Sequence, residues 1–128
     1  MQTSIPPQPL RILIVDDSSD HANSLASLLV PRGYTVQIAY SSVAALEQAE
    51  VYPADVVLLD IGLPDMDGYE LATRLRELLP SAMFIAVSGH AGDAFQAKAR
   101  AVGIEEYFIK PVAVAKLREV LDGMAKRT

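Results

Sequence analysis

Residues 56–68, VVLLDIGLPDMDG, contain the clearest indication of how this chain folds. Four consecutive aliphatic residues bounded by polar or turn residues are too short for a buried helix and are typical of a strand covered on both faces. Asp60 follows directly, at the carboxyl end of that strand. In doubly wound parallel sheets, ligands bind in the crevice beyond these strand ends. Asp60 is thus placed for chemistry, although on its own it is more simply interpreted as a turn residue.

The composition narrows the classes of protein to consider. With 128 residues, 51% of them hydrophobic, the chain suits a single domain with one core. The net charge of -5, from 16 acidic and 11 basic residues, argues against nucleic-acid binding by phosphate neutralisation. The absence of cysteine excludes disulfides, thiolate metal sites and thiol nucleophiles. Without a signal peptide or an apolar run of roughly 18 residues, we expect a cytoplasmic protein that does not contact membranes.

Apolar runs and turn residues predict five strands that alternate with five helices. We expect residues 1–9, which hold three of the eight prolines, to form a flexible lead or linker before a folded domain at 10–128. The strict alternation predicts a doubly wound, flavodoxin-like parallel α/β sheet, for which the strand order 2-1-3-4-5 is a common arrangement. The strands are expected at 10–15, 34–39, 56–59, 83–87 and 107–109.

Helix ends and buried faces follow from caps, prolines and helical spacing. Pro31 and Gly33 are expected to close the first helix, and Ser41 to cap the second. Asp67 and Glu70 have the spacing of a capping box at the start of the third helix. That helix is expected to end at a proline, Pro80, and to bury a face of leucines: Leu71, Leu75, Leu78 and Leu79.

Parallel strands place their carboxyl ends at one edge of the sheet, so Asp16, Asp17, Asp60, Ser88 and Lys110 should converge there. Three carboxylates packed together repel each other, and a hard cation with oxygen ligands, such as Mg²⁺, relieves that repulsion. An ammonium and a hydroxyl nearby would complement an anion with several oxygens, namely a phosphoryl group. Each residue taken alone also has an ordinary structural explanation: an acidic residue in a loop, a helix cap, a small residue at the end of a strand, or a charge exposed to water.

With these motifs the chain resembles the receiver domain of two-component response regulators, from Leu10 to the last helix. An acidic pair follows the first strand, and Asp60 is followed by proline four residues later and glycine eight residues later. Serine and a small residue follow the fourth strand, and Lys-Pro follows the fifth. The resemblance implies that Asp60 is the phosphoacceptor, which attacks a phosphohistidine on a histidine kinase or histidine phosphotransfer protein and becomes an acyl phosphate.

The resemblance also implies roles for the residues around Asp60. Asp17, Asp60 and the backbone carbonyl of Gly62 would hold Mg²⁺ or Mn²⁺, with Asp16 acting mainly through a metal-bound water. Lys110 would pair with Asp60 first and with the phosphoryl group later. Phosphoryl transfer needs positioning and charge neutralisation more than covalent machinery, so this set of residues suits it.

Other matching positions concern access and switching. Ser88 would hydrogen-bond a phosphoryl oxygen, and Gly89 would leave room for the phosphoryl group to enter. The bond between Lys110 and Pro111 is expected to be a cis peptide, as in the family. Tyr107 stands where the family has an aromatic ring that turns inward when the serine hydroxyl is drawn toward the phosphoryl group.

Two departures from the family concern the lifetime of the acyl phosphate. Gly62, two residues after Asp60, and His90, two residues after Ser88, are not an amide or acid placed to orient water. We therefore expect a fairly long-lived phosphoryl state. No histidine metal site is expected, because His21 lies far from His90 in the sequence.

The predicted fourth helix, residues 93–102, offers a candidate output surface. At about 100° per residue, Phe95, Ala99 and Val102 face the core, and a strip of small residues lies beside them. We expect this strip, with Tyr107, to dock a partner or a second copy across helix four, strand five and helix five. Alanine also simply favours helices, which is an equally good interpretation. The strip consists of Ala94, Ala97 and Ala101.

The favoured function is a signalling switch and not a turnover enzyme. A haloacid-dehalogenase-like phosphatase would need a second Asp two residues after its nucleophile, where this chain has Gly62, and a cap that 128 residues hardly accommodate. A receiver-like binding module that has lost phosphorylation is opposed by the complete set of site residues. The domain either works alone or belongs to a hybrid histidine kinase, whose receivers residues 59–72 resemble most.

Overall fold

The structure, a computed structural model, describes residues 10–89 and 92–125. The expected lead at residues 1–9 and the expected role of His90 lie outside the described residues. Five parallel strands form one sheet in the order β2-β1-β3-β4-β5, as predicted. The strands are β1 (Arg11–Val15), β2 (Thr35–Ala39), β3 (Val56–Asp60), β4 (Met83–Ser88) and β5 (Ile104–Ile109).

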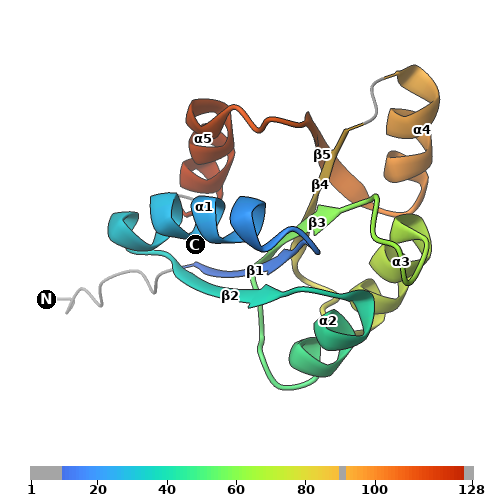
Figure 1. Cartoon of the computed structure of the whole chain (residues 1–128), viewed down its shortest axis with the longest axis horizontal. Coiled ribbons are helices and arrows are strands. Elements are labelled where there is room, and N and C mark those ends of the chain that lie inside the picture. The colour runs from blue at the N-terminus through green and yellow to red at the C-terminus, as the bar shows by residue number, and fades with distance from the viewer. Residues whose placement is uncertain (1–9, 90–91, 126–128) are drawn as a thin grey trace, which may run out of the picture.

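Helices alternate with the strands and cover both faces of the sheet. Helices α1 and α5 lie on one face, and α2, α3 and α4 lie on the other (Figure 1). This doubly wound arrangement confirms the predicted fold class. The helices are α1 (Ser19–Leu29), α2 (Ser42–Ala49), α3 (Gly68–Leu78), α4 (Asp93–Ala101) and α5 (Val114–Ala125), with a short 3-10 turn η1 (Val30–Arg32) after α1.

Two apolar clusters, one on each face of the sheet, hold the layers together. On one face, strand residues such as Ile12 and Leu58 pack with α1 and α5. On the other face, Leu13 and Leu59 pack with α2, α3 and α4. Neighbouring residues enter opposite clusters because successive side chains of a strand point to opposite faces. β3 lies in the middle of the sheet and is buried over its whole length, so it carries Asp60 to the edge on a rigid strand.

β5 begins three residues earlier than the sequence pattern predicted, at Ile104 instead of Tyr107. Glu105 and Glu106 interrupt the apolar run, and both are exposed because β5 is an edge strand that pairs only with β4. Charged residues are common on edge strands, where they discourage pairing with other chains. Apolar runs alone therefore do not indicate the first half of this strand.

α3 differs in two details from the helix predicted by the sequence. Leu79, just past the helix, continues its buried ridge at intervals of four residues, so Leu78 lies about 100° away from that ridge and is 39% exposed. Asp67 is the N-cap residue, but its side chain makes no capping hydrogen bond, so the predicted capping box is absent. At the start of α3 the backbone of Gly68 lies close to that of Ile61, where a Cβ would meet the Ile61 backbone oxygen at 2.6 Å.

α4 buries less of its surface than predicted. Ala99 is its buried residue, and Val102 packs against the core from just beyond the helix. Phe95, also expected in the core, is 38% exposed. Because α4 meets the core through Ala99 in its C-terminal half, its first turn, with Phe95, remains at the surface.

Asp65, which the sequence analysis left without a role, caps α2 from the loop between β3 and α3. Its carboxylate accepts hydrogen bonds from the N–H groups of Ser42 and Val43, at 3.0 and 3.4 Å. The predicted cap is also present, since Ser41 Oγ accepts a bond from Ala44 N–H at 3.1 Å. Burial acts to raise the pKa of Asp65, but the bonds from Ser42 and Val43 outweigh it and lower that pKa. A carboxylate at the N-terminus of a helix stabilises it, because its negative charge interacts favourably with the positive end of the helix dipole.

Tyr34 and α5 form a contact that makes stability depend on pH. Tyr34 is buried, and its hydroxyl donates a hydrogen bond of 2.7 Å to Asp122 Oδ1. Burial, and then the bond to Asp122 and its negative charge, raise the pKa of Tyr34 to about 12. The folded protein therefore holds the tyrosine proton more tightly than the unfolded chain does, where the pKa is about 10.

We expect the free energy of unfolding to fall as pH rises from about 10, the unfolded pKa, to about 12, the folded pKa. Below this window the wild type should be about 1–2 kcal/mol more stable than Tyr34→Phe. Between about pH 10 and 12 the difference in stability between wild type and Tyr34→Phe should shrink, because ionised Tyr34 can no longer donate its hydrogen bond to Asp122. Urea unfolding of both proteins across this range checks the prediction, and a constant difference would contradict it.

Candidate functional site

The carboxyl ends of the strands bring the expected residues together at one edge of the sheet. β1 and β3 are neighbours in register, so Asp16 and Asp60 leave their strands side by side. Oxygens of Asp16, Asp17 and Asp60 all lie within 4.8 Å of one another. Lys110 Nζ, just past β5, lies 3.1 Å from Asp60 Oδ2 and 3.6 Å from Asp16 Oδ2. The predicted convergence of these four residues is thus present in the fold.

Asp60 is 6% exposed, and both of its carboxylate oxygens accept hydrogen bonds. Oδ1 accepts one from the N–H of Gly62 at 2.9 Å, and Oδ2 accepts one from Lys110 Nζ at 3.1 Å. Burial raises the pKa of Asp60 above its ordinary value, and the negative charge of Asp16 adds to this. A further cation beside Asp60 would favour the ionised carboxylate, which is the form that can act as a nucleophile.

Asp16 is 2% exposed and is held by several donors. Its Oδ1 accepts a hydrogen bond of 2.9 Å from Ser18 N–H, and its Oδ2 contacts His21 Nδ1. Burial acts to raise the pKa of Asp16, but the bonds from Ser18 and His21 and the charge of Lys110 lower it. His21 was not among the site residues predicted from the sequence. The only signal was its place in the first turn of α1, three residues after the N-cap Ser18.

Lys110 is the cation that faces both carboxylates. Burial acts to lower the pKa of Lys110, but its bond to Asp60 and the negative charges of Asp60 and Asp16 raise it. Three carboxylates against one ammonium leave an excess of negative charge, which a hard divalent cation offsets. Ligands on opposite sides of Mg²⁺ lie about 4.2 Å apart, which is close to the spacing of the oxygens of Asp16, Asp17 and Asp60, all within 4.8 Å of one another. The donor set fits such a cation.

The remaining predicted residues lie around this cluster. Ser88 ends β4 and is 1% exposed. Gly89 is exposed, and a Cβ built there would meet nothing within 4 Å, so the approach is open at this position. The Lys110–Pro111 peptide bond is cis, as the resemblance implied.

Tyr107 links β5 to the helices on its side of the sheet. It is partly buried against the core cluster under α2, α3 and α4. Burial raises the pKa of Tyr69 on α3. The charge of Tyr107 and a hydrogen bond with Tyr107 raise it further. The hydroxyl of Tyr69 donates a 3.3 Å hydrogen bond to the backbone oxygen of Phe95 on α4. β5, α3 and α4 are therefore connected through these side chains.

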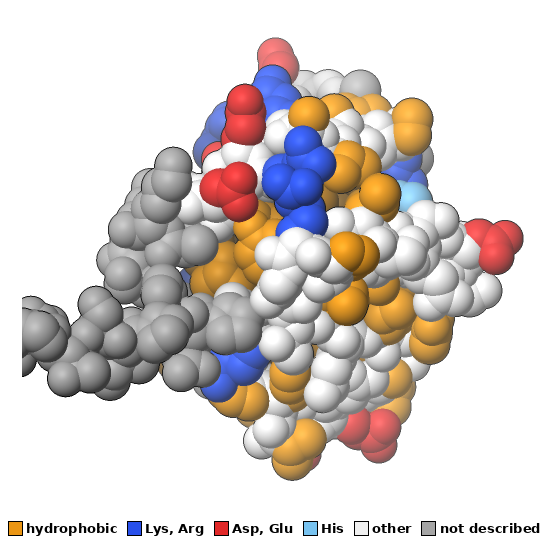
Figure 2. Space-filling model, turned by 90° about the vertical axis from the view of Figure 1, so that its left-hand side faces the viewer, with side chains coloured by type: hydrophobic (Ala, Val, Ile, Leu, Met, Phe, Trp, Pro, Cys, Tyr) orange, Lys and Arg blue, Asp and Glu red, His pale blue; other side chains and the backbone are white. Residues whose placement is uncertain are grey.

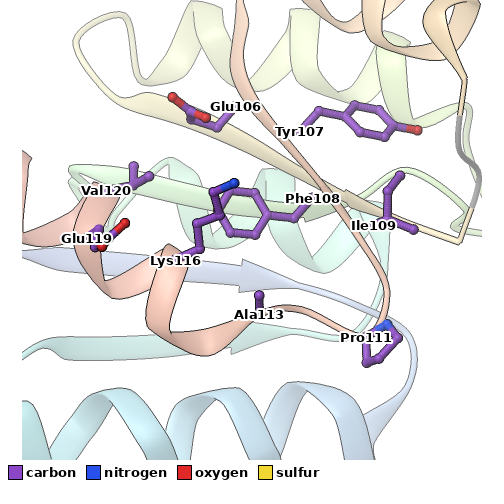
Figure 3. A pocket seen from close by; sticks show the side chains of 9 residues that line it. All are labelled: Glu106, Tyr107, Phe108, Ile109, Pro111, Ala113, Lys116, Glu119 and Val120. Carbon is purple, nitrogen blue, oxygen red and sulfur yellow. The ribbon is translucent and has the colours of Figure 1, made fainter.

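The expected output surface carries a groove between β5 and α5, with a volume of about 340 Å³. Figure 3 shows the ring of Tyr107 pointing away from Lys116 and Ala113. The predicted alanine strip, Ala94, Ala97 and Ala101, is exposed on α4. The groove is lined by Glu106, Tyr107, Phe108, Ile109, Pro111, Ala113, Lys116, Glu119 and Val120.

The outer surface shows no wide area of one charge on the face drawn in Figure 2. There, basic side chains lie close to acidic ones, and hydrophobic side chains are scattered among polar ones. Among the helices of the described residues, none is long and apolar enough to cross a membrane.

Comparison with known protein families matches residues 12–122 to the response regulator receiver domain. The chain belongs to this family. Receiver domains are the phosphoacceptor domains of two-component signalling, and they work with histidine kinases or histidine phosphotransfer proteins. The cluster at the sheet edge is therefore the candidate phosphoacceptor site of a receiver domain.

Individual relatives agree with this assignment. A response regulator receiver protein of Anaeromyxobacter sp. (strain Fw109-5) is 37% identical over 110 residues, which cover 86% of this chain and 46% of that protein. The crystal structure of a CheY-like receiver domain protein from Methanospirillum hungatei JF-1 is 34% identical, with a TM-score of 0.83, and covers 94% of this chain and 99% of that one.

A third relative was crystallised in a modified state. This response regulator from Burkholderia pseudomallei, with a phosphorylated aspartic acid, a calcium ion and citrate, is 29% identical. Its TM-score is 0.83, and the match covers 92% of this receiver domain and 69% of that chain. The receiver domain spans about half, or less, of the length of the curated relatives that it matches.

Proposed function

We propose that this receiver domain takes a phosphoryl group from a phosphohistidine of a kinase or phosphotransfer protein onto Asp60. The N–P bond of the phosphohistidine breaks, a bond forms between a carboxylate oxygen of Asp60 and phosphorus, and the partner histidine leaves as an imidazole. The observation that carries the proposal is the position of Asp60 at the end of buried β3, within 4.8 Å of two acidic neighbours and in contact with the ammonium of Lys110.

A divalent cation completes the proposed site. Asp17, Asp60 and the backbone carbonyl of Gly62 would hold Mg²⁺ or Mn²⁺, and Asp16 would act mainly through a metal-bound water. Such an ion supplies neutralisation of negative charge where a phosphoryl group meets carboxylates. The spacing of the Asp oxygens supports this role, as do the calcium ion and phosphorylated aspartic acid of the Burkholderia pseudomallei relative.

Residues on the other side of Asp60 would receive the phosphoryl oxygens. Lys110 pairs with Asp60 before transfer and would then pair with the phosphoryl group, as a donor that is already in place. Ser88 would hydrogen-bond a phosphoryl oxygen, and exposed Gly89 would leave the entry open. The domain would thus catalyse its own phosphoryl transfer and dephosphorylation and no other turnover.

The signal would leave through the surface formed by α4, β5 and α5. Movement of Ser88 toward the phosphoryl group would be coupled to Tyr107, whose connection to Tyr69 reaches α3 and α4. The exposed alanine strip of α4 would then dock a partner or a second copy. An Ala97→Arg variant that signals and associates normally would remove the strip from this role.

The acyl phosphate is proposed to be fairly long-lived. Gly62 offers no side chain to orient an attacking water beside Asp60, and a Cβ built there would lie 3.6 Å from Asp60 Oδ1. A Gly62→Asn variant would place an amide at this position, and its phosphoryl group should be lost faster than that of the wild type.

The test of phosphorylation is intact mass after incubation with acetyl phosphate and Mg²⁺. The wild type should gain the mass of one phosphoryl group, and this gain should be lost with Asp60→Asn or when the metal is chelated. Asp20→Asn is the matched control, since it removes an exposed carboxylate from the nearby first turn of α1.

The control should gain mass as the wild type does. If the folded wild type binds Mg²⁺ but gains no mass, phosphoacceptance fails and the chain acts as a silent binding module. If Asp60→Asn gains the same mass as the wild type, a different residue is modified and the role of Asp60 is wrong.

A further inference from the structure

The contact between His21 and Asp16 belongs to none of the roles assigned above. His21 lies in the first turn of α1, and its Nδ1 contacts Asp16 Oδ2. The other oxygen, Oδ1, accepts the bond from Ser18 N–H. Each oxygen thus has its own protein partner, so rotation of the carboxylate would break at least one contact. The side chain of Asp16 is 3% exposed, which leaves little water to replace a lost donor.

We propose that His21 is a positioning residue for the phosphoacceptor site, which orients Asp16 toward the cation and keeps Lys110 on Asp60. The inference rests on the proposed function, because it assigns His21 a part in that metal-dependent site. His21 itself would touch neither the cation nor the phosphoryl group.

Lys110 lies closer to Asp60 than to Asp16. Lys110 Nζ lies 3.1 Å from Asp60 Oδ2 but 3.6 Å from Asp16 Oδ2, so the closer contact is with Asp60. Asp16 Oδ2 is the same oxygen that His21 contacts. A buried carboxylate oxygen that loses a donor is costly, and Lys110 is the nearby donor that could replace it. Without His21, Lys110 would shift toward Asp16 and away from Asp60.

Cation binding also depends on the orientation of Asp16. Mg²⁺ usually keeps several of its waters and binds through one or two carboxylates, so an acid such as Asp16 acts by accepting a bond from a bound water. That acceptor works only if its lone pairs point in a fixed direction. Partners that orient the ligands of a metal site typically contribute about 10- to 100-fold in affinity. Loss of the His21 contact should weaken cation binding within this range.

Two substitutions separate the hydrogen bond from the shape of the side chain. In His21→Asn, the amide nitrogen stands the same number of bonds from Cα as His21 Nδ1, so it can donate to Asp16. His21→Leu places a methyl group there and cannot donate. Ser24→Ala, one turn further along α1 and exposed, is the control for a change in the helix.

The measurement is titration with Mg²⁺ alone, followed by backbone amide signals in two-dimensional NMR at one fixed pH. We expect the dissociation constant to be about 10-fold higher in His21→Leu, and to stay within about 2-fold of the wild type in His21→Asn and Ser24→Ala. The same spectra show whether each variant is folded. If His21→Leu does not fold, His21→Ala, which also lacks the donor, takes its place.

Each outcome decides between the two proposals. If the wild type does not bind Mg²⁺, the proposed function fails and the role of His21 fails with it. If the wild type binds but the variant without the donor binds equally well, only the role of His21 is overturned. If His21→Asn binds as weakly as His21→Leu, donation to Asp16 is not what His21 contributes, and the inference is also overturned.

Discussion

Replacement of Lys110 by methionine should slow phosphorylation of Asp60 by acetyl phosphate about 100-fold or more, which is typical for loss of one preorganised donor to a reacting oxygen. Methionine keeps the length of the side chain but removes the ammonium that contacts Asp60 and Asp16. Two buried carboxylates then lose their shared cation. The rate is measured by intact mass against time at saturating Mg²⁺.

Cation binding should change in the opposite direction in Lys110→Met. Removing one positive charge from the cluster raises its negative excess, so Mg²⁺ should bind as tightly as to the wild type or more tightly. Lys116→Met, on α5, is the matched control and should phosphorylate normally. A phosphorylation rate of Lys110→Met within a few-fold of the wild type would show that the ammonium does not assist transfer.

Gly68→Ala should destabilise the fold by about 3 kcal/mol or more, at the upper end of the range for overpacked sites. A Cβ at Gly68 would lie 2.6 Å from the backbone oxygen of Ile61 and 2.7 Å from its Cα. Because these atoms belong to the backbone, the loop itself would have to move. Urea unfolding followed by circular dichroism measures the loss.

The same movement should reach the proposed phosphoacceptor, since Ile61 directly follows Asp60. We therefore also expect slower phosphorylation of the Gly68→Ala protein under conditions in which it remains folded. Gly123→Ala is the matched control, because a Cβ there would meet nothing within 4 Å. That substitution should stabilise α5 by about 0.5–1 kcal/mol. Equal stability of Gly68→Ala and wild type would contradict the close approach.

Edges of elements were predicted less well than their order. The apolar pattern located β5 only from Tyr107, because Glu105 and Glu106 are both charged and exposed on this edge strand. The same pattern does not show whether Leu78 or Leu79 is the residue buried in the core. Both lie within one turn of the end of α3, and which of them is buried depends on how the helix packs against the sheet.

Contacts between side chains at the ends of strands were predicted from the sequence. Contacts that depend on the path of a loop or the start of a helix were not. The meeting of Asp16, Asp60 and Lys110 follows from the parallel sheet itself. The contact of His21 with Asp16 depends on the angle at which α1 leaves β1, and the capping of α2 by Asp65 depends on the path of another loop. Neither angle nor path has a signature in hydrophobic periodicity.

The order of the strands, the two-sided burial of β3 and the placement of acidic residues, serine and lysine at one edge were all readable in the sequence, because they depend on local periodicity and on the geometry common to parallel sheets. The tertiary structure alone decided how Lys110 is shared between Asp60 and Asp16, and which donors hold each carboxylate oxygen. These contacts depend on differences of fractions of an ångström in distance between groups that lie far apart in the chain. They arise only when all the elements pack together.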